Sequence, residues 1–275
     1  MQVIGVVGYS GVGKTTLVER LVERLAERGR VGSIKHLGHE ANIDTEGKDT
    51  ARHRAAGASV TYGVTDDAGW FATGEDRELG ETLDRMAAEY DYAVVESFTE
   101  SSLPHVRLGD RTSGGEVVYE AADAEAVDMD QLVAVVEDLA PYESLESLVA
   151  EVKRSPPAEY SGAIATFTGR VRARDGPDEE RTTHLEFERY DEVAAERRRE
   201  ITADLESRDG VLEVLLYHRT GVVQAGEDIV HVVVLAGHRA EAFEAVSDGI
   251  DRLKEEVPIF KKEVTIEDTV WAHER

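Results

Sequence analysis

Residues 2–16 read QVIGVVGYSGVGKTT, an apolar run followed by a glycine-rich loop and the start of a helical pattern. The apolar run predicts a buried strand, because its β-branched side chains suit a sheet that is covered on both faces. The loop fits the pattern GxxxxGK(S/T) at every position from Gly8 to Thr15. Residues 15–29 continue with apolar side chains at helical spacing. The stretch therefore predicts a strand, a phosphate-binding loop and a helix, in that order.

The spacing of this loop suits a bound nucleotide. Glycines allow backbone N–H groups to turn inward around a phosphate, and the N-terminus of the following helix adds partial positive charge. We expect Lys14 to reach the β- and γ-phosphates and the Thr15 hydroxyl to bind Mg²⁺. The predicted nucleotide-binding residues are Gly8, Ser10, Gly11, Gly13, Lys14, Thr15 and Thr16.

Two further apolar segments, residues 31–36 and 90–98, predict strands on either side of more polar sequence. The order of strand, helix and strand predicts an α/β fold with a P-loop NTPase-like parallel sheet and helices on both faces. Asp44 follows the second predicted strand, and Glu96 lies near the end of the third. Together with Thr15 of the loop, these two acids are the candidate Mg²⁺ ligands. An ordinary polar surface loop is the alternative interpretation for Asp44. No segment of the NKxD type is present, so the spacing does not choose the base.

The composition bounds the class of protein. A formal net charge of −26 over 275 residues and a hydrophobic content of 41% predict a folded, acidic protein suited to a salt-rich cytosol. We expect it to be cytoplasmic, without a signal peptide or a membrane span, because no apolar run is long enough to cross a bilayer. The absence of cysteine excludes disulfides, thiolate metal sites and cysteine nucleophiles. The acidic surface argues against nucleic acid as a partner.

A change in composition marks a domain boundary. Residues 112–152 hold eleven acids and no Lys or Arg, with Pro141 between two apolar segments. We therefore expect a first domain at residues 1–140 and a second at residues 141–275. The second half alternates between strand-like and helix-like patterns, which predicts an α+β domain. Its expected strands are residues 162–171, 184–190, 211–218 and 229–236, and its expected helices are residues 193–207 and 238–257.

Residues 238–263, HRAEAFEAVSDGIDRLKEEVPIFKKE, carry three of the seven lysines in the chain. Lys254 and Lys261 flank Pro258, which ends the helix, so a helix end and a strand can aim both amines at one point. Lysine offers an ammonium whose pKa can fall enough for base or nucleophile chemistry, and we expect both amines to be partly desolvated. Lys262 alternates to the other side of the strand, so we expect it to be structural. The alternative interpretation of the whole stretch is a solvated surface with salt bridges. The helix face predicted to be buried consists of Ala242, Phe243, Val246, Ile250 and Leu253.

The first half of the chain resembles the molybdopterin-guanine dinucleotide biosynthesis adapter family of GTP-binding proteins. The resemblance rests on GYSGVGKTTL, on IKH after the second strand, on D-x-x-GKD-(S/T) at residues 44–50, on R-x-AGA at residues 54–58 and on VVESF. The family usually has glycine where this chain has Ser97, a departure that leaves Glu96 in place but bears on hydrolysis. The resemblance implies GTP and Mg²⁺ as cofactors.

The second half resembles the catalytic large subunit of molybdopterin synthase. The resemblance rests on FTGRVR, LEFERY, YHRTG, the Gly-Glu pair at 226–227, HRAEAF and LKEEVPIFKKE. It implies conversion of cyclic pyranopterin monophosphate into the dithiolene molybdopterin, with sulfur from the Gly-Gly C-terminal thiocarboxylate of a ubiquitin-like small subunit. It also implies a homodimer through the C-terminal domain. The implied catalytic residues are Lys254 and Lys261, and the implied substrate-binding residues are Arg172, His238 and Arg239, cations that suit a phosphate and an anionic tail.

Three functions compete on these grounds. The resemblance favours a fused enzyme, in which a GTP-binding adapter domain precedes a molybdopterin synthase catalytic domain. A nucleotide-dependent scaffold that docks a ubiquitin-like partner without catalysis is the second, and Lys254 and Lys261 in a lysine-poor chain argue against it. A P-loop kinase with a regulatory domain is the third function. It is disfavoured because the first half lacks a recognisable lid or a second substrate motif.

Overall fold

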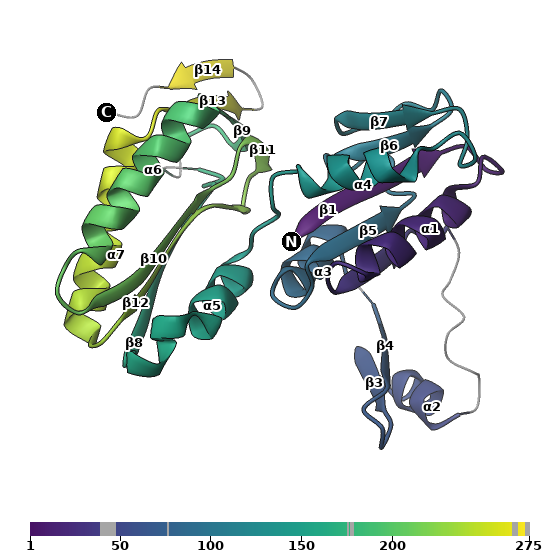
Figure 1. The fold of residues 1–275 in the computed structure, drawn as a ribbon, viewed down its shortest axis with the longest axis horizontal. Helices are drawn as coiled ribbons and strands as arrows, with labels where there is room; N and C mark the ends of the chain where they lie inside the picture. Colours follow the sequence, from purple (N-terminus) through teal and green to yellow (C-terminus); the bar gives the residue numbers. More distant parts are fainter. Residues whose placement is uncertain (39–47, 76, 175, 177–178, 266–268, 273–275) are drawn as a thin grey trace. The chain divides into compact units, whose positions relative to one another are not determined.

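The computed structural model describes residues 1–38, 48–75, 77–174, 176, 179–265 and 269–272. Contacts within the chain divide it into two compact units, Met1–Tyr142 and Glu143–Arg275, which are coloured from purple to teal and from teal to yellow in Figure 1. The division follows Tyr142, close to the boundary expected after residue 140. Each unit has its own sheets and its own hydrophobic core, and each is described by itself.

A five-stranded parallel sheet forms the centre of the first unit. Its strands are, in spatial order, β2 (Val31–Lys35), β5 (Tyr92–Glu96), β1 (Gln2–Gly8), β6 (His105–Leu108) and β7 (Val117–Ala121). The apolar run that opens the chain is the central strand, and all of its residues after Gln2 are buried. Helices cover both faces of the sheet, as is usual for a parallel sheet.

The described helices of the first unit are α1 (Lys14–Ala26), α2 (Asp49–Ala55), α3 (Leu79–Ala87) and α4 (Met129–Glu137). Helices α1, α3 and α4 divide between the two faces of the sheet, whereas no residue of α2 is buried. Leu17, Leu21 and Leu25 of α1 are fully buried and pack with α4 on one face, whereas Leu83 of α3 packs on the other. The predicted α/β sheet with helices on both faces is confirmed. An antiparallel hairpin, β3 (Val60–Val64) and β4 (Trp70–Gly74), follows α2.

The acidic stretch at residues 112–152 contains regular structure, including β7 and α4. Asp128 caps α4 by accepting hydrogen bonds from the backbone N–H groups of Asp130 and Gln131. Leu132, Val133 and Val136 of the same helix are buried. The acids of this helix and its caps therefore lie on the exposed face of a packed helix.

Two antiparallel sheets build the second unit. One contains, in spatial order, β10 (Val211–His218), β12 (Asp228–Ala236) and β8 (Ala163–Arg170). The other contains β11 (Gly221–Gln224), β9 (Thr182–Arg189), β13 (Ile259–Thr265) and β14 (Thr269–Ala272). The helices are α5 (Leu145–Arg154), a 3₁₀ turn at Pro156–Tyr160, α6 (Asp191–Glu206) and α7 (Arg239–Glu256). The predicted α+β class is confirmed, and β11 and β14 lie outside the strands that the sequence pattern predicted.

The three-stranded sheet is covered on both faces by helices. Val232 and Val234 of β12 point into a cluster with α6 and α7, while Val233 and Leu235 point to α5. This alternation explains why β12 is a continuous apolar run, because both of its faces are buried.

The buried face of α7 differs from the predicted one at Phe243, whose side chain is 67% exposed. Ala245 and Gly249 face the sheet instead, and a Cβ atom on Gly249 would lie 3.3 Å from a methyl group of Val232. Small residues let this helix lie close to the sheet, so the buried face is rotated away from Phe243. The helix ends at Glu256, before Pro258, as predicted.

Candidate functional sites

The glycine-rich loop has the backbone conformation that phosphate binding requires. Gly11 and Gly13 have φ values of 88° and 87°, in the left-handed region that favours glycine. Gly13 is the N-cap of α1, and a Cβ atom there would lie 2.7 Å from the Cβ of Ala124. Gly8 ends β1, where a Cβ would meet the Leu108 carbonyl oxygen at 2.7 Å. The glycines are therefore needed both for the turn and for close packing around it.

The predicted nucleotide-binding residues other than Gly8 line a cavity of about 390 Å³ at the N-terminus of α1. Glu96 at the end of β5 accepts a hydrogen bond of 2.9 Å from the Thr15 hydroxyl. Parallel pairing through β1 and β5 brings them together, although they are far apart in sequence. The cavity is lined by Ser10, Gly11, Gly13, Lys14, Thr15, Thr16, Lys35, Glu96 and Ser97.

Positive charge is concentrated at this loop. The Lys14 ammonium donates a hydrogen bond of 2.8 Å to the Tyr9 carbonyl, and the Arg111 guanidinium lies over the Tyr9 ring. Burial lowers the pKa of Lys14, Glu96 opposes this shift, and the positive charges of Arg111 and Lys35 lower that pKa further. An anionic phosphate would relieve this crowding of cations. Arg111 was not predicted, and no motif around it distinguishes it from a surface arginine.

The oxygen ligands present suit a hard cation such as Mg²⁺. The Thr15 hydroxyl and the Glu96 carboxylate share a hydrogen bond at the rim of the cavity, and hydroxyl and carboxylate oxygens are the ligands that Mg²⁺ takes in nucleotide sites. Asp44, the third predicted ligand, lies outside the described residues. Within the described ranges, no group of three or more His, Cys, Asp or Glu side chains gathers as a metal site.

Ser97, directly after Glu96, has a φ of 70°, which is unfavourable for a residue with a Cβ atom. We expect Ser97→Gly to stabilise the first unit by about 0.5–1 kcal/mol, because relief of this strain exceeds the added entropy of the unfolded chain. The melting temperature should rise by about 2–3 °C. Ser102→Gly is the matched control in the same loop, with no positive φ, and should lower it slightly. Equal effects of the two changes would show that Ser97 is unstrained.

A second cavity, of about 420 Å³, opens within the second unit. Part of its wall is apolar, with Phe167, Leu185 and Phe187 from the sheets and Ile250 and Leu253 from α7. Cations line the same cavity, which is of the size that small-molecule ligands occupy. They are Arg170, Arg172, Lys254 and Lys261.

The structure brings the two predicted catalytic lysines to this one cavity. Lys254 comes from the last turn of α7 and Lys261 from β13, on the two sides of Pro258. Lys262 alternates to the other face of β13 and pairs with Glu186 of β9 at 2.8 Å. In one copy of the chain Lys254 is exposed and Lys261 is half-buried, so the expected partial desolvation does not hold for Lys254. The reason is that Lys254 lies at the edge of the buried face of α7, one turn after Ile250, where its side chain still reaches solvent.

Several cavity residues were not predicted from the sequence, among them His218 and Glu263. His218 is 9% exposed, and its Nδ1 donates a hydrogen bond of 2.6 Å to the Arg219 carbonyl, which fixes the tautomer. Glu263 lines the cavity and accepts a hydrogen bond from the Thr182 hydroxyl. His218 lies in the YHRTG motif, which could have marked it. Glu263 could have been found from its alternation with Lys261 along one strand.

The structure does not bring His238 and Arg239 to this cavity within one copy of the chain. They lie at the N-terminus of α7, whose 18 residues end beside Lys254. Arg239 and Lys254 are thus about 22 Å apart along the helix axis. Arg172 does line the cavity, so one of the three predicted substrate-binding residues joins the lysine pair.

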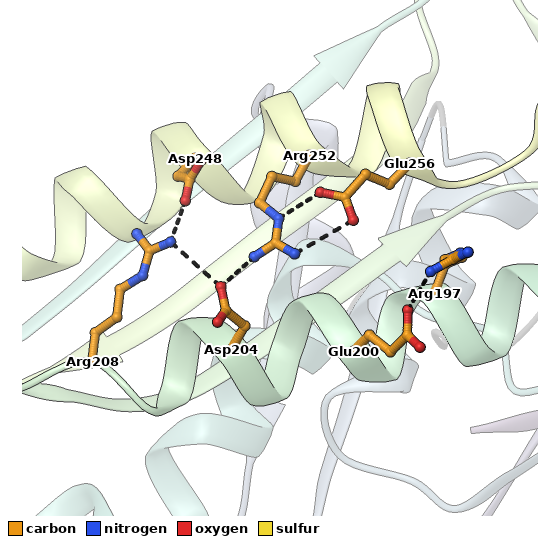
Figure 2. Close-up of polar contacts among 7 residues, drawn as sticks. All are labelled: Arg197, Glu200, Asp204, Arg208, Asp248, Arg252 and Glu256. Carbon is orange, nitrogen blue, oxygen red and sulfur yellow. Dashed lines mark hydrogen bonds and ion pairs between the residues drawn. The ribbon is translucent and has the colours of Figure 1, made fainter.

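Ion pairs join α7 to α6 near the end that carries Lys254. Figure 2 shows Arg252 of α7 between Glu256 of the same helix, at 2.6 Å, and Asp204 of α6, at 2.5 Å. Arg208 lies between Asp204, at 3.8 Å, and Asp248. The hydrogen bond from Arg252 lowers the pKa of Glu256 and raises the pKa of Arg252. The network fixes the last turns of α7 against α6.

We expect Arg252→Gln to lower the free energy of unfolding of the second unit by about 1 kcal/mol at low salt, because a network of partly exposed ion pairs is lost. The effect should shrink towards zero at about 1 M salt, where charges are screened within about 3 Å. The effect of Arg252→Gln should also shrink at pH values below 4.5. The pKa of Glu256 is lowered in the folded protein, and the stability that this provides is lost as the pH falls through that pKa. Denaturant unfolding at two salt concentrations measures this.

Arg199→Gln is the matched control, because Arg199 lies on α6 and bonds to the Ala195 carbonyl rather than to a described acid. Both variants change the net charge equally, so the difference between them isolates the ion pairs from the general repulsion of an acidic surface. A difference that persists unchanged at high salt would contradict an electrostatic origin.

The fold and the sites define a two-unit protein, in which a phosphate-binding-loop nucleotide site precedes a cation-lined cavity in an α+β unit. Residues 3–138 match the family described as molybdopterin guanine dinucleotide synthesis protein B, and residues 138–256 match the MoaE protein family. The chain belongs to the molybdopterin synthase family, as a fusion of these two domain types, and is an enzyme of molybdenum cofactor biosynthesis.

Similar proteins match the whole chain or one half of it. A protein of Haloferax volcanii named probable molybdopterin synthase is 47% identical over 275 residues, 100% of both chains. The molybdopterin synthase catalytic subunit of Pyrococcus abyssi is 36% identical over 46% of this chain and 82% of its own. A crystal structure of Bacillus subtilis MobB covers 50% of this chain and 100% of its own, at 27% identity and a TM-score of 0.41. In the described part of the chain, none of the helices combines the length and apolar character needed to cross a bilayer.

Proposed function

We propose that the second unit transfers sulfur from the C-terminal Gly-Gly thiocarboxylate of a ubiquitin-like small subunit to cyclic pyranopterin monophosphate, forming the dithiolene of molybdopterin. The observation that carries this proposal is the meeting of Lys254 and Lys261, from separate elements, at one cavity. The chain has seven lysines among 31 basic residues, so two at one cavity are unlike its general surface.

The residues of the cavity divide the work between binding and chemistry. The Arg172 guanidinium suits the substrate phosphate, because it is always charged and offers a planar fork of donors. Lys254 and Lys261 suit proton transfer, stabilisation of the anions that form, and a transient link to the carbonyl of the donor tail. The apolar part of the wall lowers the local dielectric constant, which strengthens these electrostatic contacts.

The first unit, on this proposal, binds GTP with Mg²⁺ and assists formation of the guanine dinucleotide form of the cofactor. Lys14 and the backbone N–H groups of the loop would hold the phosphates. Thr15 and Glu96 would hold the metal, with Asp44 as a further ligand, and the metal would neutralise phosphate charge. The cavity of about 390 Å³ at the N-terminus of α1 supports this part of the proposal.

A homodimer through the second unit is part of the proposal. His238 and Arg239 can reach a lysine pair only if a second copy presents its N-terminal end of α7 to the cavity. Phe243, 67% exposed and one turn from Arg239, is an apolar side chain that such a contact could cover. Sedimentation of the wild-type chain and of Phe243→Glu tests this, and a monomer in both cases contradicts it.

The cytoplasm of a salt-rich cell is the compartment that the proposal favours. A net charge of −26 keeps the surface soluble at high ionic strength, where salt screens the repulsion. The function itself is tested by incubating the protein with thiocarboxylated small subunit and cyclic pterin and assaying for dithiolene. Product supports the proposal, whereas a complex without product supports the scaffold alternative.

A further inference from the structure

The nucleotide site contains a lysine to which the proposed function assigns no role. Lys35 is the last residue of β2 and lies beside Glu96 in the parallel register of β2 and β5. Its ammonium is 3.0 Å from Glu96 Oε1 and 3.4 Å from the Thr15 hydroxyl. Thr15 donates to the same Glu96 oxygen at 2.9 Å. One carboxylate oxygen therefore holds a hydroxyl and an ammonium together.

The charge balance of this cluster depends on Lys35. Glu96 is 5% exposed, and a buried carboxylate without a partner is strongly unfavourable. Among the described side chains, Lys35 is the cation that forms an ion pair with it. The Lys35 side chain is itself half exposed and lines the cavity, so its ammonium can move towards a ligand there.

Lys35 and Mg²⁺ compete for the same two oxygens. The Thr15 hydroxyl and the Glu96 carboxylate are the groups that would hold the metal, and the ammonium bridges them. Mg²⁺ requires ligands at about 2.1 Å in octahedral geometry, which leaves no room for an ammonium between them. A lysine on a flexible four-carbon stem can give way without moving the backbone.

We propose that Lys35 is a resident cation of the nucleotide site, which neutralises Glu96 when no nucleotide is bound, yields to Mg²⁺ when nucleotide binds, and then pairs with the γ-phosphate. The role rests on the proposed binding of a nucleotide. It makes Lys35 a specificity-determining residue for triphosphate over diphosphate, because a diphosphate has no γ-phosphate for it to meet. It also explains how a buried acid tolerates an empty site.

The first test uses the metal alone. Melting of the wild type at constant ionic strength should shift by less than about 1 °C between zero and millimolar Mg²⁺, because Lys35 occupies the site. Lys35→Met should melt at a lower temperature and recover several degrees with Mg²⁺, and the double variant Lys35→Met with Glu96→Gln should lose that Mg²⁺ response. Lys153→Met, an exposed lysine on α5, removes the same charge elsewhere and should behave as the wild type.

The second test compares fluorescent GTP and GDP, each with Mg²⁺. Lys35→Met should weaken GTP by about 10-fold or more and GDP by less than about 3-fold, whereas Lys35→Arg should keep most of the preference. Equal losses for both nucleotides, or a Mg²⁺ response that is the same in wild type and Lys35→Met, would overturn the inference. A wild type that binds neither nucleotide overturns the proposed function of this unit, while the Mg²⁺ melting test still decides whether Lys35 holds the metal's place.

Discussion

Lys254→Arg and Lys261→Arg should each lose most product formation, by about 10²–10⁴-fold, while still binding the small subunit. Arginine keeps the positive charge at the cavity, so attraction of an anionic tail and of a phosphate should survive. Arginine cannot release a proton near neutral pH or attack a carbonyl, so any step that needs a free amine should stop. The measurement is a dithiolene assay with a parallel binding measurement on each variant.

Lys262→Arg is the matched control, because Lys262 follows Lys261 on the same strand and pairs with Glu186 on the other face. It should retain nearly full activity. Full activity in both Lys254→Arg and Lys261→Arg would reduce the pair to electrostatic attraction. Loss of binding together with activity would favour the docking scaffold instead.

Lys14→Ala should weaken GTP binding by about 1–3 kcal/mol, a roughly 5- to 150-fold loss of affinity. The ammonium lies at the phosphate-binding loop beside Arg111 and Lys35, and burial already lowers its pKa, so a phosphate gains more from it than from a surface lysine. Dithiolene formation in vitro should be unchanged, because the lysine pair belongs to the other compact unit. Equilibrium titration with a fluorescent nucleotide measures the first effect.

Lys153→Ala removes the same charge from an exposed position on α5 and should bind GTP as the wild type does. A Lys14→Ala variant with wild-type affinity would show that the loop does not hold the phosphates. Loss of dithiolene formation in Lys14→Ala, with the protein still folded, would show that the nucleotide site controls the second unit.

Local sequence was sufficient for the features that depend on few neighbouring residues. The strand, loop and helix at residues 2–29 follow from β-branched residues, glycine spacing and helical periodicity, and the structure contains all three. The end of α7 before Pro258 is local as well, because proline removes a backbone donor. The opposite placement of Lys261 and Lys262 follows from the alternation of side chains along a strand.

Periodicity was not sufficient where the partner surface decides which side chains are buried. Phe243 fits the helical repeat, but close packing of Gly249 on β12 rotates α7 so that Phe243 is exposed. The sequence pattern also failed to predict β11. This short strand is defined by its pairing with β9, which its own sequence does not indicate. Burial is a property of two surfaces together, and a sequence pattern describes one of them.

The sequence by itself determined the phosphate-binding loop, the α/β and α+β classes, and the meeting of Lys254 and Lys261 across Pro258. Only the tertiary structure decided which distant groups share a site. Parallel pairing of β2, β5 and β1 brings Lys35 and Thr15 to one carboxylate oxygen of Glu96. The length of α7 keeps Arg239 away from Lys254. The physical reason is the distance along the chain over which each interaction acts. Turn and helix preferences act over a few residues, whereas the contacts of an ion pair depend on strand order and register, which no short segment specifies.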